Sequence, residues 1–177
     1  YELIDQLIEE NGGIIKTSDA VAVGVSKTFF YNYVKDRGLE KASHGVYISP
    51  DAWVDTMYLL HVRCPRAVFS HDTALFLHGL TDREPLRYTV TVKSGYNPWR
   101  LTEDNIKVYT VKPSLYELGL SKAKTSFGRT VPSYDIERTV CDIIRSRNNI
   151  EIQTFQDTLK QYIQRKDKNL RRLTQYA

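Results

Sequence analysis

Two short helical patterns, separated by a turn at Gly24 and followed by a hairpin pattern, constrain the fold of this chain more than any other feature. The first helix is predicted from Thr17, whose hydroxyl can cap its amino end, to Val23. The second is predicted from Ser26, another capping residue, to about Arg37. Two helices joined by a short glycine-containing turn are typical of a helix-turn-helix unit.

The flanking segments extend this unit over residues 1–50. Apolar residues at helical spacing predict an amphipathic helix over residues 1–11, which Gly12 and Gly13 would end. After Gly38, the segment LEKASHGVYIS predicts two short strands around a turn at His44 and Gly45. Three helices and a terminal hairpin predict a winged helix-turn-helix domain.

The helix after Gly24 has two chemically different faces. Phe29, Phe30 and Tyr33 share one face at helical spacing, and we expect this face to be buried. The opposite face carries side chains that can reach phosphates, hydrogen-bond base edges or touch thymine methyl groups. With the hairpin tip and the preceding turn, the predicted DNA contacts are Lys16, Thr17, Ser26, Lys27, Thr28, Tyr31, Asn32, Lys35, Lys41, His44 and Tyr47.

The charge distribution qualifies this prediction. Residues 1–50 hold 5 Lys and Arg against 7 Asp and Glu, a net charge of −2, whereas residues 51–177 hold 20 against 14, a net charge of +6. Four of the seven acids lie in the first helix, which we expect to face away from DNA. Small three-helix units with a hairpin also serve as dimerisation or scaffold modules, so DNA binding is one of two readings of this domain.

Residues 51–177 form the second predicted domain. A helix capped by Asp51 is expected to end at Cys64, and Ser70 is expected to cap a helix that ends at Gly79. Further helices are predicted over 137–147, capped by Asp135 or Ser133, and over 152–176, with strands at 67–69, 87–92, 106–111 and 131–136. Strands flanked by helices without a regular alternation favour an α+β fold for the chain.

The chemical motifs of common enzymes and metal sites are missing from the sequence. It has no glycine-rich phosphate loop ending in Lys-Ser or Lys-Thr, no paired-histidine motif and no Gly-x-Ser-x-Gly elbow. His61, His71 and His78 are not spaced to share a helix face, and the two cysteines, Cys64 and Cys141, make no disulfide framework. No stretch approaches the ~20 apolar residues of a membrane span. We therefore expect a cytoplasmic binding protein with no enzymatic activity, cofactor, metal or membrane partner.

Two charged clusters remain. Arg138 and Asp142 are four residues apart on a predicted helix and can pair, which is more often structural than catalytic. Residues 160–172 hold six Lys and Arg against Asp167 alone. This run is either a solvated helix face or a second basic surface for DNA or an acidic partner. Its members on or beside the polar face are Lys160, Arg165, Lys168, Arg171 and Arg172.

Several segments together resemble one known family. Residues 17–50, with the hairpin strand His44-Gly45-Val46-Tyr47-Ile48, look like the N-terminal winged helix of AbiEi-family antitoxins. SHDTALFLHGL, the TVTV strand and YDIERTVCDII are similar to motifs of that family's antitoxin domain, in the same order. The motif residues are Ser70, His71, Ala74, His78, Gly79, Leu80, Glu137, Arg138, Thr139 and Asp142.

The resemblance implies an antitoxin of a type IV toxin–antitoxin system with two activities. Its winged helix would bind inverted repeats in double-stranded DNA at its own promoter, with two copies on the operator from a monomer or weak dimer. Its C-terminal domain would counteract a nucleotidyltransferase toxin in abortive phage defence, and a stable complex with the toxin is not required. Some related antitoxins are thought to modify their toxins, but this sequence has no nucleotide-binding loop.

Two other hypotheses stay open at the sequence level. The chain is a winged-helix transcriptional regulator whose C-terminal domain binds a ligand or dimerises, with no toxin partner. Alternatively, the C-terminal domain is an enzyme that acts on a toxin, for example a kinase. A nucleotidyltransferase gene beside this one would favour the antitoxin over the regulator. A change in the mass of the toxin after treatment with the chain and nucleotide would favour the enzyme.

Overall fold

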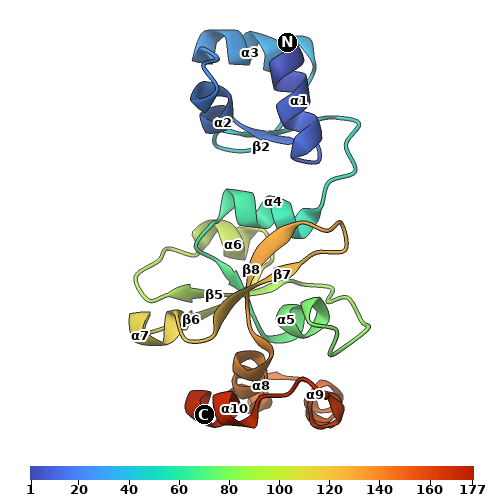
Figure 1. Ribbon diagram of the computed structural model, residues 1–177. Coiled ribbons are helices and arrows are strands. Elements are labelled where there is room, and N and C mark those ends of the chain that lie inside the picture. Colours follow the sequence, from blue (N-terminus) through green and yellow to red (C-terminus); the bar gives the residue numbers. More distant parts are fainter. The chain divides into compact units, whose positions relative to one another are not determined.

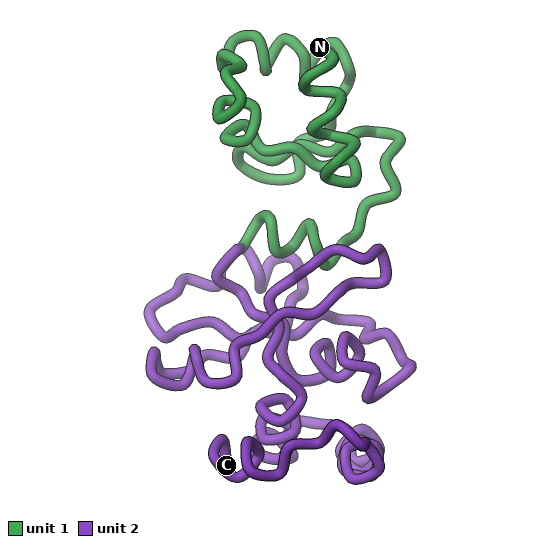
Figure 2. The backbone as a smooth tube through the Cα atoms, viewed as in Figure 1, with its two compact units in different colours: residues 1–64 green, residues 65–177 purple.

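The computed structural model describes residues 1–177 and divides into two compact units, residues 1–64 and residues 65–177 (Figure 2). The sequence predicts the boundary at residue 50, whereas the structure assigns the intervening segment and its helix to the first unit. Both units combine helices with a sheet, and the sheet of the second unit is mixed (Figure 1). The fold class is therefore α+β, as predicted.

Unit 1 contains the helices and the hairpin that the sequence pattern indicates, and also the strand β1 (Ile14–Lys16), which the pattern does not predict. Its elements are α1 (Glu2–Glu10), β1, α2 (Thr17–Ala22), α3 (Lys27–Asp36), β2 (Glu40–Ser43), β3 (Val46–Ile48) and α4 (Thr56–Arg63). The three strands form an antiparallel sheet in the order β1-β3-β2, so the segment before α2 pairs with the hairpin that follows α3. The turn between α2 and α3 has Gly24 at φ 91°, in the left-handed region that favours glycine.

The predicted helix caps of unit 1 are only partly correct. Ser26 caps α3, because its Oγ accepts a hydrogen bond from the Phe29 N–H at 3.2 Å. Thr17 is the first residue of α2 rather than its cap, since Lys16 occupies the cap position. Helix α4 begins later than predicted, because the side chain of Asp55, and not that of Asp51, accepts the capping hydrogen bond from the Tyr58 N–H.

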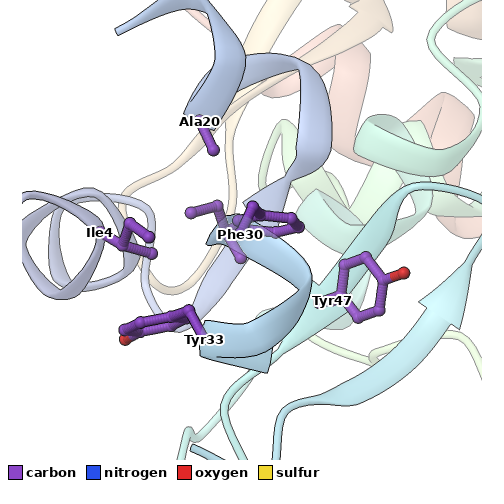
Figure 3. Close-up of a cluster of buried hydrophobic side chains, with 6 residues drawn as sticks. Ile4, Ala20, Phe30, Tyr33 and Tyr47 are labelled. Atoms are coloured by element: carbon purple, nitrogen blue, oxygen red, sulfur yellow. The ribbon is translucent and has the colours of Figure 1, made fainter. Parts of the chain in front are cut away.

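An apolar and aromatic cluster holds unit 1 together (Figure 3). Phe30 of α3 is fully buried, with Ile4 of α1 and Ala20 of α2 packed around it. Tyr47 of β3 closes the cluster, its ring centroid 5.7 Å from that of Phe30 in an edge-on arrangement. Side chains from several elements thus converge on α3, which fixes the face that this helix presents outward.

Unit 2 is built on a five-stranded mixed sheet in the order β6-β5-β4-β8-β7. Its strands are β4 (Val68–Phe69), β5 (Thr89–Lys93), β6 (Lys107–Val111), β7 (Leu120–Lys124) and β8 (Thr130–Tyr134). Its helices are α5 (His71–Leu77), α6 (Trp99–Glu103), α7 (Pro113–Tyr116), α8 (Ile136–Arg145), α9 (Ile152–Gln164) and α10 (Leu170–Tyr176), with a short 3-10 turn at Arg147–Asn149. Helix α8 packs against α5, α9 and α10, and the last two end the chain (Figure 1).

The structure corrects three expectations for unit 2. Ser70 occupies the cap position of α5, but its side chain accepts no capping hydrogen bond. The single long helix predicted over 152–176 is two helices, α9 and α10, separated by residues 165–169. Strand β7 has no counterpart in the sequence prediction, and it pairs with β8 at the edge of the sheet. A second apolar core, formed by Leu75, Leu80, Val140, Ile143 and Tyr162, lies between α5, α8 and α9.

Candidate functional site

The exposed side of α3 carries most of the residues predicted to contact DNA. Its two lysines, Lys27 and Lys35, are both exposed. Tyr31 lies on the same side and is 47% exposed. Phe29, predicted to be buried, is instead 46% exposed and packs edge-on against Tyr1. The predicted contacts of α3 that are exposed in the structure are Ser26, Lys27, Thr28, Tyr31, Asn32 and Lys35.

The hairpin places its predicted contacts in two different environments. Lys41 on β2 and His44 in the turn are exposed, as a DNA contact requires. Tyr47 is 9% exposed and belongs to the core, with its ring 6.5 Å from that of Tyr31. Its role is therefore to pack β3 against α3, and burial raises the pKa of its hydroxyl.

Lys16 and Thr17 are half-buried where α2 meets the hairpin. The Thr17 backbone N–H donates to the Gly45 carbonyl at 2.9 Å, which ties the start of α2 to the hairpin turn. The Lys16 ammonium lies 3.5 Å from the Asp19 carboxylate. These two residues connect the elements of unit 1 and offer less accessible surface than the α3 lysines.

The acids of unit 1 nearest to α3 are engaged by other side chains. Asp5 of α1 accepts hydrogen bonds from the Tyr33 hydroxyl and from the Arg37 guanidinium. Burial, followed by the hydrogen bond to Asp5, raises the pKa of Tyr33 to about 12. Asp36 accepts from the Tyr1 hydroxyl. These contacts lie on the α1 side of α3, which leaves its two lysines as the exposed charges of the outward side.

In unit 2, the resemblance motif at Ser70 and His71 forms a buried chain of hydrogen bonds. The Ser70 Oγ accepts from the Thr91 hydroxyl at 2.8 Å and lies 2.9 Å from the His71 Nδ1. The His71 Nε2 lies 3.2 Å from the Ser146 Oγ, and the imidazole stacks on the Tyr109 ring at 3.8 Å. A neutral ring protonated on Nε2 satisfies every one of these contacts.

The environment of His71 keeps that ring neutral. Burial, and then the positive charges of Lys107 and Arg138, lower its pKa to about 3. The backbone of His71 also has φ 50°, a value that residues other than glycine rarely adopt. His71 therefore links β5, α5 and the end of α8 as an uncharged residue within the fold.

Arg138 and Asp142 form the ion pair that their spacing predicts, and the pair is buried. The Arg138 Nε donates to both carboxylate oxygens of Asp142, at 3.0 and 3.1 Å. Its Nη1 donates to the carbonyls of Leu115 and Leu118, and the guanidinium lies 4.2 Å from the centroid of the Tyr134 ring. Burial raises the pKa of Asp142, and Arg138 opposes that shift. The pair holds the segment before β7 against α8.

Gly119 is required by this arrangement. Its φ is 74°, and a Cβ built there would lie 2.6 Å from the Cβ of Arg138, closer than two side chains can approach. A side chain at this position would push α8 away from the segment whose carbonyls Arg138 binds. The packing of Arg138 thus depends on a residue outside the family motif.

Glu137 and His78 make equally specific internal contacts. The Glu137 Oε1 accepts from the Asn169 N–H at 2.8 Å, and the Asn169 side chain caps α10 by accepting from the Arg172 N–H. The His78 Nε2 donates to the Tyr134 carbonyl at 2.6 Å. Each titratable residue of the motif is therefore held by a partner within unit 2.

The predicted second basic surface is divided by the break between α9 and α10. Arg165 donates to Asp167 and to the His78 carbonyl, so it stabilises the turn. Arg172 lies 3.9 Å from the Asp135 carboxylate, and the Lys168 ammonium donates to the Arg165 carbonyl. Lys160 on α9 and Arg171 on α10 are exposed. The five residues consequently do not form one helix face.

Sequence reasoning missed the partners that fix the unit 2 motif. Thr91, Tyr109, Ser146 and Asn169 come from four different segments and carry no local signal of this role.

Cys64 and Cys141 are buried and free. No group of three or more His, Cys, Asp or Glu side chains is arranged to hold a metal ion. None of the helices combines the length and apolar character needed to cross a membrane.

Comparison with known proteins yields a structural neighbour. No family model matches the sequence, and no curated protein matches it either. The crystal structure of the Rv2827c protein from Mycobacterium tuberculosis is similar to this chain with a TM-score of 0.62. The similarity covers 98% of this chain and 69% of that protein, at 12% sequence identity. At this identity the likeness shows a shared α+β fold and nothing about activity.

Proposed function

We propose that the chain is a DNA-binding autorepressor of the AbiEi-like antitoxin type, in which unit 1 acts as a winged helix-turn-helix. The observation that supports DNA binding is the exposed side of α3, which presents two lysines, a tyrosine and hydrogen-bonding side chains. The amino end of such a helix enters the major groove in helix-turn-helix proteins, while cations beside it bind phosphates. The exposed Lys41 and His44 of the hairpin supply the wing.

The antitoxin activity is assigned to unit 2 from the sequence resemblance. In this proposal unit 2 counteracts a nucleotidyltransferase toxin by binding and not by catalysis, in the cytoplasm. The internal contacts of His71, Glu137, Arg138 and Asp142 support a binding role, because acid–base catalysis needs a titratable group that can reach a substrate. The surface of unit 2 would then carry the recognition, with the motif residues holding it in shape.

A footprint on the DNA upstream of the chain's own gene tests the repressor activity. We expect protection of an inverted repeat, with one copy of the chain on each half. Replacing Lys27, Tyr31 and Lys35 by alanine is expected to weaken operator binding by about a hundredfold or more, because each phosphate or base contact contributes roughly 1–3 kcal/mol. Lys122→Ala, a change of an exposed lysine on β7, is the matched control.

Co-expression with a neighbouring nucleotidyltransferase tests the antitoxin activity separately. The triple α3 variant is expected to rescue growth as well as the unchanged chain, since its unit 2 is intact. Loss of rescue in a folded triple variant contradicts the division of labour between the units. An unchanged mass of the neutralised toxin supports binding over modification, and a mass shift refutes it.

A further inference from the structure

A cavity of about 570 Å³ opens in unit 2 beyond the end of β5, and no motif residue lines it. This volume lies within the range of small-molecule sites. The cavity is lined by Arg66, Lys93, Ser94, Gly95, Tyr96 and Tyr116. Neither the resemblance nor the proposed DNA contacts involve any of these residues.

The sheet topology brings these residues together. Strands β5 and β6 are parallel, so both end at the same edge of the sheet. Strand β4 runs antiparallel to β5, with Val68 opposite Thr91, so Arg66, which precedes β4, lies beside the end of β5. The Tyr96 N–H donates to the Lys93 carbonyl at 3.1 Å and closes a turn around Gly95. Carboxyl ends of parallel strands are frequent positions for ligands.

The lining contains two cations and no carboxylate. Arg66 and Lys93 are exposed, and neither forms an ion pair with an acid. The Lys93 ammonium lies 5.0 Å from the centroid of the Tyr116 ring, and the Tyr116 hydroxyl donates to the Arg66 carbonyl at 2.7 Å. The Glu117 carboxylate acts electrostatically on the Tyr116 hydroxyl, but Glu117 does not line the cavity. The cavity is therefore positively charged.

The second chemical feature is aromatic surface. Tyr96 and Tyr116, both half-buried, line the cavity together with the two cations. Paired cations without a competing carboxylate favour a phosphate over a neutral or cationic ligand. Aromatic side chains such as tyrosine can hold a nucleotide base by stacking. The ligand that combines a phosphate with a planar aromatic ring is a nucleotide.

We propose that this cavity binds a nucleotide, with its phosphate on Arg66 and Lys93 and its base against Tyr96. The ligand is either a free mononucleotide or one nucleotide of a single strand, which share this chemistry. The site has no residue in common with α3, so it does not depend on the proposed repressor activity.

Calorimetric titration of the full chain with AMP, adenosine, ribose 5-phosphate and inorganic phosphate tests the proposal. AMP is expected to bind, and the three partial ligands are expected to bind at least about tenfold more weakly, because each lacks the phosphate or the base. Arg66→Gln and Lys93→Gln should each weaken AMP binding by about tenfold. Lys122→Gln, which removes an exposed lysine on β7, should leave the affinity unchanged.

A conservative pair tests the base-binding wall. Tyr96→Phe keeps the ring and is expected to bind AMP like the unchanged chain, whereas Tyr96→Leu is expected to bind about tenfold more weakly. Thermal unfolding of both variants verifies that the turn is intact. Equal binding of AMP and inorganic phosphate, or an affinity unaffected by Arg66→Gln and Lys93→Gln, overturns the proposal.

A trinucleotide distinguishes the two sources of the ligand. The titration uses a Lys27→Ala/Lys35→Ala background, which removes the α3 cations. If the trinucleotide binds more tightly than AMP and Lys93→Gln weakens this binding by about tenfold, the ligand is a strand. Equal binding of the two supports the free nucleotide. Trinucleotide binding that Lys93→Gln leaves unchanged, with no AMP binding, overturns the site.

Discussion

The two units of the chain differ in where they keep their polar residues. Unit 1 has an apolar and aromatic core, and the polar side chains of α3 point outward. Unit 2 buries Arg138, Glu137, Asp142 and His71, and each has a partner within the unit. Polar residues with free hydrogen-bonding groups can bind a ligand, whereas those with satisfied groups stabilise the fold. Changes to α3 should therefore affect binding, and changes to the unit 2 motif should affect stability.

The largest expected effect is that of Arg138→Ala. The substitution leaves the Asp142 carboxylate buried without its main partner and frees the carbonyls of Leu115 and Leu118. We expect unit 2 to lose about 3–5 kcal/mol of its free energy of unfolding. Hydrogen exchange resolved by peptide measures this loss in α8 while α3 serves as an internal reference.

Lys122→Ala is the control for that experiment, and its effect is expected to stay within about 0.5 kcal/mol. If Arg138→Ala changed stability no more than this control, the buried pair would be dispensable. The proposed difference between the two units would then be contradicted, because the buried polar residues of unit 2 would not contribute to its stability.

The second prediction concerns the acid sensitivity of unit 2. The pKa of His71 is lowered to about 3 by burial and by neighbouring cations, so between pH 6.5 and 3 the unfolded chain binds a proton that the folded chain does not. The stability contributed by His71 is therefore present above pH 6.5 and is lost as the pH falls. The slope approaches about 1.4 kcal/mol per pH unit.

His71→Asn isolates this contribution, because asparagine tolerates positive φ and does not titrate. Burial also raises the pKa of the neighbouring Asp72 and of Asp142, but these groups are present in both proteins and largely cancel in the difference. We expect the advantage of the unchanged chain in urea unfolding to shrink from pH 6.5 downward. A constant difference between pH 7 and pH 4.5 would show that His71 is not buried in a neutral form.

Local patterns predict unit 1 well because its elements depend on neighbours in sequence. The Ser26 cap, the turn at Gly24 and the hairpin at Gly45 each require only a few adjacent residues. The hairpin pattern puts Tyr47 at the DNA surface, but packing against Phe30 decides its position. Such contacts between distant segments are not visible in a local pattern.

Unit 2 is harder to predict for the same physical reason. At the break between α9 and α10, the Asn169 N–H donates to Glu137, which lies in another helix, and a local pattern does not show this contact. Strand β7 reads LSKAK and lacks apolar alternation, because it is an edge strand with lysines in solvent. The Arg138–Asp142 pair is predictable from its four-residue spacing, but its burial is not.

A smaller effect tests the caps of unit 1. Ser26→Ala removes the hydrogen bond to the Phe29 N–H and is expected to destabilise α3 by about 1 kcal/mol. Thr17→Ala removes a hydroxyl that is buried without a partner, so we expect no loss of stability. Hydrogen exchange in α2 and α3 compares the two variants. A larger loss for Thr17→Ala than for Ser26→Ala would restore Thr17 as the cap that its sequence position suggests.

The smallest expected effect concerns the basic residues of α9 and α10, and it tests whether DNA contacts are confined to unit 1. Lys160 and Arg171 are exposed, whereas Arg165 is held by Asp167 and the His78 carbonyl. If the first two bind phosphates, Lys160→Gln/Arg171→Gln should reduce the salt dependence of operator binding by about one unit of slope for each phosphate that is no longer bound. Arg165→Gln should leave the slope unchanged and instead loosen the turn before α10. A slope unaffected by the double variant assigns every phosphate contact to unit 1 and leaves the basic residues of unit 2 as solvated surface.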